Sequence, residues 1–171
     1  VVFVDDHGGG CGEQGEGEPG ILLYREEIQV PLIVKMPGSA MSGRSVDAPV
    51  QLIDLMPTIA AQTKTDVASL KLPGQSLLSA SANRRVYSET YYPRFYFGWS
   101  ELHSLIDRDR HYIRAPSPEL YDIAHDAAER RNLANDDRRA LNEMREGIAP
   151  YIQGPATTNF DTKHAKKVEL L

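Results

Sequence analysis

The sequence predicts an α/β fold: the last strands of a mixed sheet with a helix on one face, followed by a small subdomain built from an antiparallel sheet and a helix. Two runs of apolar, largely β-branched residues, 1–4 and 30–36, are typical of strands buried in a sheet. The segment 54–61 carries the start signals of a helix. These three observations define the first part of the chain.

The helix predicted over 54–61 is recognised by its first turn and by its apolar positions. Asp54 occupies the N-cap position, and Pro57 falls in the first turn, where its missing N–H costs nothing. Four residues then form an apolar stripe that we expect to face the sheet: Leu55, Met56, Ile59 and Ala60. Asp54 is accordingly interpreted as structural.

A stretch rich in serine, alanine and asparagine near residues 80–85 marks the predicted domain boundary. We expect residues 1–80 to form the end of the α/β core, 81–153 the antiparallel subdomain, and 154–171 a tail. In the subdomain we expect a strand over 85–92 and a hairpin of 101–106 with 110–114. A helical turn is expected over 126–134, starting at the capping-box pair Asp126 and Glu129. A helix is expected over 136–148, ended by Pro150.

Composition narrows the class of protein. The 171 residues suit one domain, and the formal net charge is −5 with 19 scattered basic residues, which argues against a nucleic-acid partner. No apolar run approaches the roughly 20 residues of a membrane span. The single cysteine, Cys11, excludes an internal disulfide and leaves the compartment open. Because the first residue already lies inside an apolar strand, we expect the chain to be a fragment.

The chemistry-bearing stretch follows the first strand and reads Asp5-Asp6-His7-Gly8-Gly9-Gly10. Ligands of α/β sheets bind at the carboxyl ends of strands, and a carboxylate beside a neutral imidazole can hold a divalent cation. The other interpretation is a capped helix and a plain flexible loop. In the next segment, 21–28, the apolar residues are expected to pack while Arg25, Glu26 and Glu27 face water.

The order of motifs resembles the C-terminal part of the sulfatase family, in the alkaline-phosphatase-like superfamily. The resemblance rests on Asp-His-Gly after a strand, a glycine-rich loop, Leu23-Tyr24-Arg25-Glu26-Glu27, Val30-Pro31-Leu32-Ile33-Val34 and Pro37-Gly38, and later on Glu119-Leu120-Tyr121-Asp122. It implies a metal-dependent hydrolase of sulfate esters with a formylglycine nucleophile and a divalent cation, most often Ca²⁺. By position, Asp6 would be a metal ligand, and His7 would be a metal ligand or the catalytic hydrogen-bond donor to substrate.

Three departures from the family pattern matter. The chain has no Cys/Ser-x-Pro-x-Arg motif, so the nucleophile and the first acidic ligands are expected upstream of residue 1, and this segment alone should be inactive. Pro19 stands where many relatives carry a His or Lys that binds sulfate or protonates the leaving group. Gln14 stands where relatives often have a second histidine.

Two other functions remain open at this point. One is a phosphoester or phosphonate hydrolase of the same superfamily, and the other is a degenerate, non-catalytic binding protein. The aromatic run over 91–99 could line a substrate mouth or stack on sugar rings, or it could fill a small core. The partners implied are a small-molecule or glycan sulfate ester and the missing N-terminal region. A periplasmic or extracellular location is expected if the whole protein carries a signal peptide.

Overall fold

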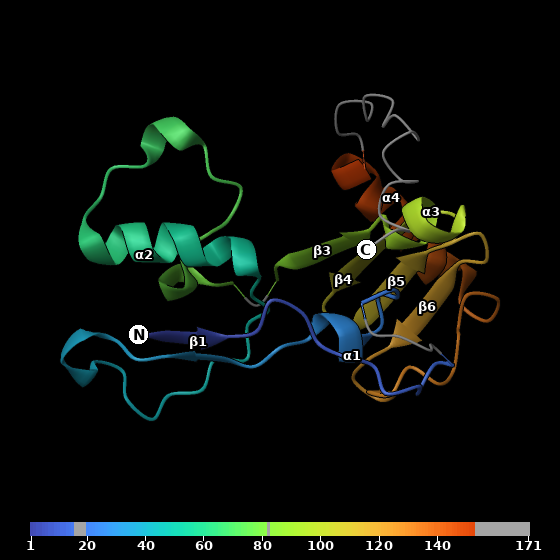
Figure 1. The fold of residues 1–171 in the computed structure, drawn as a ribbon. Coiled ribbons are helices and arrows are strands. Elements are labelled where there is room, and N and C mark those ends of the chain that lie inside the picture. The colour runs from blue at the N-terminus through green and yellow to red at the C-terminus, as the bar shows by residue number, and fades with distance from the viewer. Residues whose placement is uncertain (16–19, 82, 153–171) are drawn as a thin grey trace. The chain divides into compact units, whose positions relative to one another are not determined.

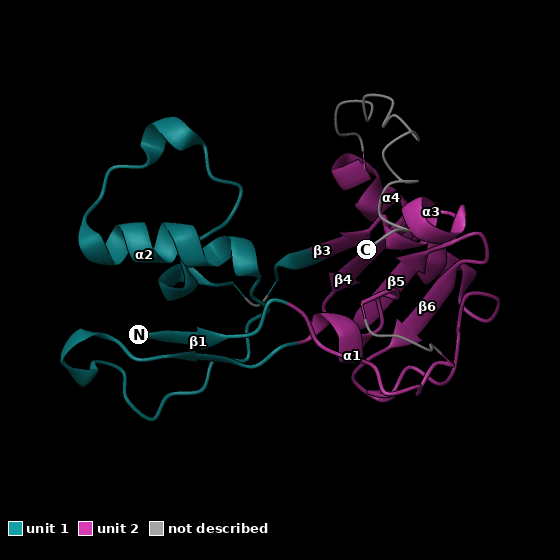
Figure 2. Ribbon diagram, in the orientation of Figure 1, with its two compact units in different colours: residues 1–6, 30–86 teal, residues 7–29, 87–171 magenta. Residues whose placement is uncertain are grey.

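The computed structural model describes residues 1–15, 20–81 and 83–152, so the tail predicted over 154–171 and the position of Pro19 lie outside the described residues. The chain divides into two compact units, neither of them contiguous (Figures 1 and 2). Unit 1 consists of residues 1–6 and 30–86, and unit 2 of residues 7–29 and 87–171. Each unit is described by itself below.

The first unit begins with a two-stranded antiparallel sheet. Strand β1 (Val2–Val4) pairs with β2 (Leu32–Val34), and Phe3 lies opposite Ile33. Both expected strands are therefore present, but the expected burial is not found within the described residues: Phe3 is 60% and Ile33 62% exposed. Two strands with no further layer described over them cannot cover their own apolar faces.

Helix α2 (Leu55–Thr63) follows the short 3₁₀ turn η2 (Leu52–Asp54). The predicted helix is confirmed, and Ala60 of its predicted apolar stripe is buried, but Met56 and Ile59 are about half exposed within the described residues. Thr58, which was not part of the predicted stripe, is buried as well. The other 3₁₀ turns of unit 1 are η1 (Pro37–Ser39), η3 (Ala68–Leu70) and η4 (Leu77–Ser79).

Asp54 has a different role from the predicted N-cap. Its side chain makes no capping bond to α2. It accepts hydrogen bonds from the backbone N–H groups of Gln51 (2.8 Å) and Gln75 (2.9 Å), and it pairs with the guanidinium of Arg84. The carboxylate is fully buried, so these donors replace the water it loses. Asp54 thereby joins three separate segments of unit 1.

The second unit is built on a four-stranded sheet in the order β3-β4-β5-β6 (Figure 1). Its strands are β3 (Arg85–Thr90, which begins in unit 1), β4 (Leu102–Asp107), β5 (Arg110–Arg114) and β6 (Glu119–Asp122). The predicted hairpin is confirmed as β4 and β5, which pair antiparallel from His103 with Arg114 to Asp107 with Arg110. Strand β6 pairs antiparallel with β5.

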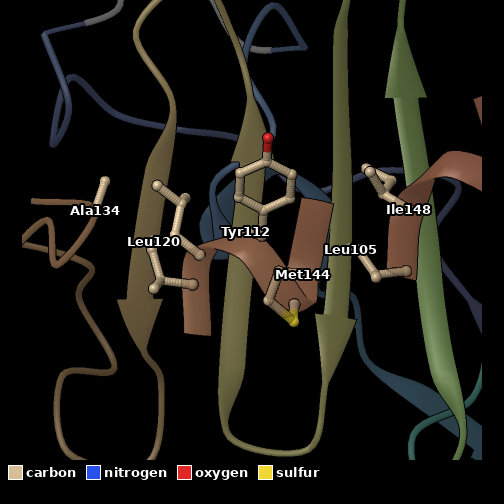
Figure 3. Close-up of a cluster of buried hydrophobic side chains, with 7 residues drawn as sticks. Leu105, Tyr112, Leu120, Ala134, Met144 and Ile148 are labelled. Carbon is tan, nitrogen blue, oxygen red and sulfur yellow. The ribbon is translucent and has the colours of Figure 1, made fainter. Parts of the chain in front are cut away.

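Helix α4 (Arg138–Ile152) covers one face of this sheet. Figure 3 shows the core between them, to which the strands and the helix both contribute side chains: Leu105, Tyr112, Leu120, Ala134, Leu141, Met144 and Ile148. The predicted helix is confirmed, but its predicted end at Pro150 is wrong, because the helix runs on to Ile152. Pro150 lies in the last turn, where one missing N–H leaves most of the hydrogen-bond ladder intact.

The short helix α1 (Arg25–Ile28) packs on the other face of the sheet. Side chains alternate across a strand, so when Tyr112 points into the α4 core its neighbour His111 points the opposite way. Segment 21–29 meets that second face through the ring of Tyr24, which lies edge-on to Tyr121 with centroids 6.1 Å apart. The remaining helix, α3 (Tyr92–Phe97), lies between β3 and β4 in the chain and replaces the end of the predicted strand over 85–92.

The helical turn predicted over 126–134 is absent. The side chain of Asp126 accepts the backbone N–H of Arg131 at 2.8 Å, while the N–H of Glu129 donates to the backbone carbonyl of Asp126 at 3.1 Å. Glu129 adopts a left-handed conformation with a φ of 52°, which takes its side chain away from a capping box. The side chain of Glu129 bonds instead to distant residues, the backbone N–H of Arg25 and the ring of His111.

Candidate functional site

The predicted site residues Asp6 and His7 both have exposed side chains at the end of β1. The division between the two units falls between them, with Asp6 in unit 1 and His7 in unit 2. His7 Nδ1 lies 2.5 Å from its neighbour's carbonyl oxygen, Gly8 O. A carbonyl only accepts, so Nδ1 carries the proton and Nε2 carries the lone pair of the neutral ring. That tautomer suits a metal ligand or a hydrogen-bond acceptor.

The glycines after His7 are held closely to α1. Gly8 N–H donates to Glu27 O at 2.7 Å, and Gly9 N–H donates to Glu26 O at 3.0 Å. A Cβ atom on Gly8 would lie 2.0 Å from the carbonyl oxygen of Glu26. Only glycine allows this approach of two backbones. The glycine triplet is therefore not a plain flexible loop, and the residue after His7 is fixed by backbone hydrogen bonds.

Glu27 was expected to face water, and this prediction is wrong. The residue is 3% exposed, and each of its carboxylate oxygens accepts one backbone N–H: Oε1 from Gly10 at 3.1 Å, and Oε2 from Gly20 at 2.6 Å. One side chain thus ties both ends of the glycine-rich segment 10–20. Local sequence gives no signal for this burial, because an acid in a charged run is usually solvated.

Glu129 is the second buried acid that the sequence did not reveal. Its Oε2 accepts the backbone N–H of Arg25 at 2.9 Å, at the first residue of α1. Its Oε1 accepts a hydrogen bond from His111 Nδ1 at 2.5 Å, and both side chains are fully buried. His111 Nε2 has no hydrogen-bond partner within the described part of the chain. Glu129 therefore fastens the start of α1 to strand β5.

A third contact fastens the segment before α1. Tyr24 and Tyr121 both donate their hydroxyl protons to Glu119 Oε2, at 2.7 and 2.5 Å. Burial and the hydrogen bond to the Glu119 carboxylate raise the pKa of both tyrosines far above the ordinary value, since ionisation would place two negative charges together. These hydroxyl groups are thus hydrogen-bond donors at any physiological pH and serve as structural links.

Gln14, which stands where relatives of the predicted family often have histidine, makes a further contact of the loop. Its Nε2 donates to the backbone carbonyl of Ala128 at 3.2 Å. The side chain is thus used to hold the loop to the turn that precedes Glu129. Cys11 is exposed, and its backbone N–H donates to Glu13 Oε2 at 2.5 Å. Both observations agree with a structural role for residues 11–14.

Asp6 and His7 offer a carboxylate and an imidazole to a divalent cation. Calcium takes about six to eight oxygen ligands, and carboxylate and imidazole together suit several transition metals. No group of three or more His, Cys, Asp or Glu side chains with metal-site spacing occurs among the described residues. Asp6 and His7 are two donors adjacent in the sequence, and their role as metal ligands stays a prediction.

The aromatic run over 91–99 does not belong to the core of unit 2. Its members are 44% to 64% exposed at four positions: Phe95, Tyr96, Phe97 and Trp99. The rings pack on one another: Tyr92 stacks on Tyr96 with centroids 4.1 Å apart, and Phe97 lies tilted against Trp99 with centroids 4.8 Å apart. Of the two predicted roles, filling a small core is wrong for these four residues. Lining a substrate mouth remains a prediction.

One further property of the chain concerns membranes. Within residues 1–15, 20–81 and 83–152, none of the helices combines the length and the apolar character that crossing a bilayer requires.

Comparison with known proteins gives a consistent family signal. Residues 20–150 match the family model described as N-sulphoglucosamine sulphohydrolase, C-terminal. A curated relative, the delta 4,5-hexuronate-2-O-sulfatase of Bacteroides thetaiotaomicron, is 27% identical, with 99% of this chain and 37% of the relative aligned. The chain spans about a third of the length of the curated relatives it matches, 32% and 37% for two of them.

Two solved structures have the same fold. A putative sulfatase from Bacteroides thetaiotaomicron superposes with a TM-score of 0.74 at 24% identity, covering 98% of this chain and 37% of that one. A phosphonate monoester hydrolase from Silicibacter pomeroyi superposes with a TM-score of 0.71 at 23% identity, covering 88% of this chain and 34% of that one. At these identities the likeness establishes the fold alone.

Proposed function

The chain belongs to the sulfatase family as its C-terminal region, in the alkaline-phosphatase-like superfamily, and from this premise we propose that it forms part of a metal-dependent hydrolase of sulfuric esters. The observation that carries the proposal is the exposed pair Asp6 and His7 at the end of β1, next to a loop fixed by Gly8 and Glu27. The sequence 1–171 contains no formylglycine motif, so the proposal requires a nucleophile from another part of the protein.

Asp6 would supply a carboxylate oxygen to the cation, and His7 would supply the Nε2 lone pair to the cation or, when the ring is protonated, donate a hydrogen bond from Nε2 to the substrate. When bound, a divalent cation such as Ca²⁺ supplies positive charge to the sulfate oxygens during transfer. The role of this chain is then to hold two donors in place. Gly8 fixes the backbone beside His7, and the hydrogen bond from Nδ1 to Gly8 O sets which nitrogen carries the lone pair.

The substrate we propose is a sulfated sugar. The curated relative named above is a hexuronate 2-O-sulfatase by name. The exposed rings around α3 offer flat apolar faces of the kind that can pack on the C–H face of a pyranose, and Tyr96 and Trp99 are the most exposed of them.

The test uses the full-length protein that contains this chain. We expect hydrolysis of 4-nitrophenyl sulfate or of a sulfated hexuronate, loss of activity after chelation of divalent cations, and a fall of about 10²-fold in kcat/KM for His7→Ala. The matched control is His125→Ala, because the side chain of His125 is 86% exposed and lies in a turn of unit 2. An active His7→Ala enzyme would remove His7 from the site.

The second candidate is a phosphonate or phosphate ester hydrolase, which the shared fold of the phosphonate monoester hydrolase favours. Parallel assays with 4-nitrophenyl phosphate and a phosphonate monoester decide between the two. Faster turnover of either compound than of every sulfate ester tested would replace the sulfatase proposal. No turnover of any of them by the metal-loaded full-length protein would favour a non-catalytic binding protein.

A further inference from the structure

We propose that Glu27 is a positioning residue: its carboxylate accepts the N–H groups of Gly10 and Gly20, its backbone carbonyl accepts that of Gly8, and these bonds set the place of His7. The inference rests on the proposed function, because the position of His7 matters only if His7 takes part in binding or chemistry. Both carboxylate oxygens of Glu27 accept hydrogen bonds from backbone N–H groups, those of Gly10 and Gly20.

The geometry requires a carboxylate. Glu27 Oε1 and Oε2 face the N–H groups of Gly10 and Gly20, and both partners are donors. Hydrogen bonds to an ionised carboxylate are roughly twice as strong as bonds between neutral groups. The residue is 3% exposed, so water does not compete for these positions. A glutamine of the same size would turn an NH₂ group toward one of the two N–H donors, and the loop would lose that end.

The same residue also acts through its backbone. Gly8 N–H donates to Glu27 O at 2.7 Å, so Glu27 bonds to the chain immediately after His7 as well as to both ends of the loop. Three glycine N–H groups, those of Gly8, Gly10 and Gly20, therefore converge on one residue of α1. These bonds tie Gly8, the residue next to His7, to α1.

Helix α1 is held to the sheet by other residues. A helix of four residues has too few internal hydrogen bonds to stand alone. Glu129 accepts the N–H of its first residue, Arg25, and Tyr24 bonds to Glu119 just before it. The position of His7 therefore depends on α1 and Glu27, which are held in turn by residues of the β5–β6 region. Glu27 acts through these contacts and is not proposed to touch the reacting atoms.

The experiment compares Glu27→Gln with Glu13→Gln in the full-length protein. Glu13 is the matched control, since it is an exposed carboxylate in the same loop that also accepts one backbone N–H, from Cys11. Hydrogen–deuterium exchange measures the protection of residues 7–15, and kcat and KM for 4-nitrophenyl sulfate are measured per folded molecule. A displacement of about 1 Å in a catalytic group can cost about 10²-fold in rate.

We expect Glu27→Gln to speed exchange over 7–15 and to lower kcat by about 10- to 100-fold, while Glu13→Gln stays within about twofold of the wild type. A purely structural role predicts a lower melting temperature with unchanged kcat per folded molecule, and that result would overturn the proposal. If the wild type hydrolyses no sulfate ester, the proposed function fails. In that case hydrogen exchange still tests the positioning role of Glu27, and unchanged protection of residues 7–15 in Glu27→Gln would contradict that role.

Discussion

Arg84 and Asp54 form a bidentate ion pair inside unit 1, with both guanidinium Nη atoms facing the two oxygens of one carboxylate. The side chain of Asp54 is fully buried, and that of Arg84 is 10% exposed. The same carboxylate accepts the N–H groups of Gln51 and Gln75, so every lone-pair direction is used. The pair therefore joins the start of α2 to the end of unit 1.

Replacing Arg84 by methionine leaves this carboxylate buried without its cation. We expect a loss of about 3–5 kcal/mol in the free energy of unfolding, because breaking a buried pair strands the remaining charge. Urea unfolding measures the change. Arg85→Met is the matched control, since its neighbour Arg85 is exposed and a change near zero is expected. A loss below about 1 kcal/mol for Arg84→Met would mean that the pair contributes as little as a surface ion pair.

The ion pair also predicts a dependence of stability on acid. Burial alone would raise the pKa of Asp54, but Arg84 and the N–H groups of Gln75 and Gln51 hold it below the usual range. The folded pKa lies below the unfolded value of about 3.9, so the stabilisation is present above about pH 4 and is lost as pH falls through the folded pKa. The difference in unfolding free energy between wild type and Asp54→Asn should shrink from pH 7 to pH 2. A constant difference would contradict this assignment.

Gly8 provides a test of the backbone contact beside His7. Alanine at this position would place Cβ 2.0 Å from Glu26 O, so the loop or α1 must shift. We expect a loss of about 1–3 kcal/mol in stability and reduced protection of residues 7–15 in hydrogen exchange. Gly15→Ala is the control, because the space around Gly15 is open, and only the cost of its positive φ is expected. Equal effects of the two changes would show that the close approach is unimportant.

The exposed apolar residues of unit 1 predict self-association of the isolated 171-residue chain. Phe3 and Ile33 face each other across β1 and β2, and Met56 and Ile59 lie exposed on α2. We expect poor solubility or dimers in sedimentation velocity, and a shift toward monomer for the double change Met56→Lys and Ile59→Lys. The control is Gln62→Lys, an exposed polar position of the same helix. A monodisperse wild-type monomer would refute this expectation.

The aromatic residues around α3 predict a selectivity between substrates. If Trp99 packs on a sugar ring, Trp99→Ala should lower kcat/KM for a sulfated oligosaccharide by about tenfold, equivalent to about 1.4 kcal/mol, and leave 4-nitrophenyl sulfate within twofold. Tyr151→Ala is a control on α4, where the ring is 43% exposed and stacks on Tyr87. Equal losses on both substrates would place Trp99 in general folding rather than in sugar recognition.

Much of the fold could be predicted from local pattern. The hairpin of β4 and β5, helix α2 and helix α4 depend on periodicity and turn residues that lie within each segment. The errors concern burial, which depends on distant partners. Glu129 bonds to Arg25 across 104 residues of sequence, and no local rule indicates that such an acid is buried.

The same contrast between local pattern and distant contacts applies to the candidate site. The ordered set of motifs, from Asp-His-Gly through Leu23-Tyr24 to Val30-Pro31, was sufficient to indicate the family, which the match over residues 20–150 confirms, while the roles of Asp6 and His7 stay a prediction. The residues that hold the loop could not be found in this way. Glu27 belongs to a charged run that resembles a solvated helix face, and its buried carboxylate binds two glycine N–H groups that only the folded chain brings together.

The two units interleave along the chain, which has a consequence for recombination between relatives. Residues 7–29 belong structurally with residues 87–152, although 57 residues of unit 1, 30–86, separate them in sequence. A chimera with one crossover near residue 80 would combine a glycine loop from one parent with a sheet from the other. Exchange of the second unit requires two inserts, one between residues 6 and 30 of unit 1 and one after residue 86, because the two compact units are interleaved along the gene.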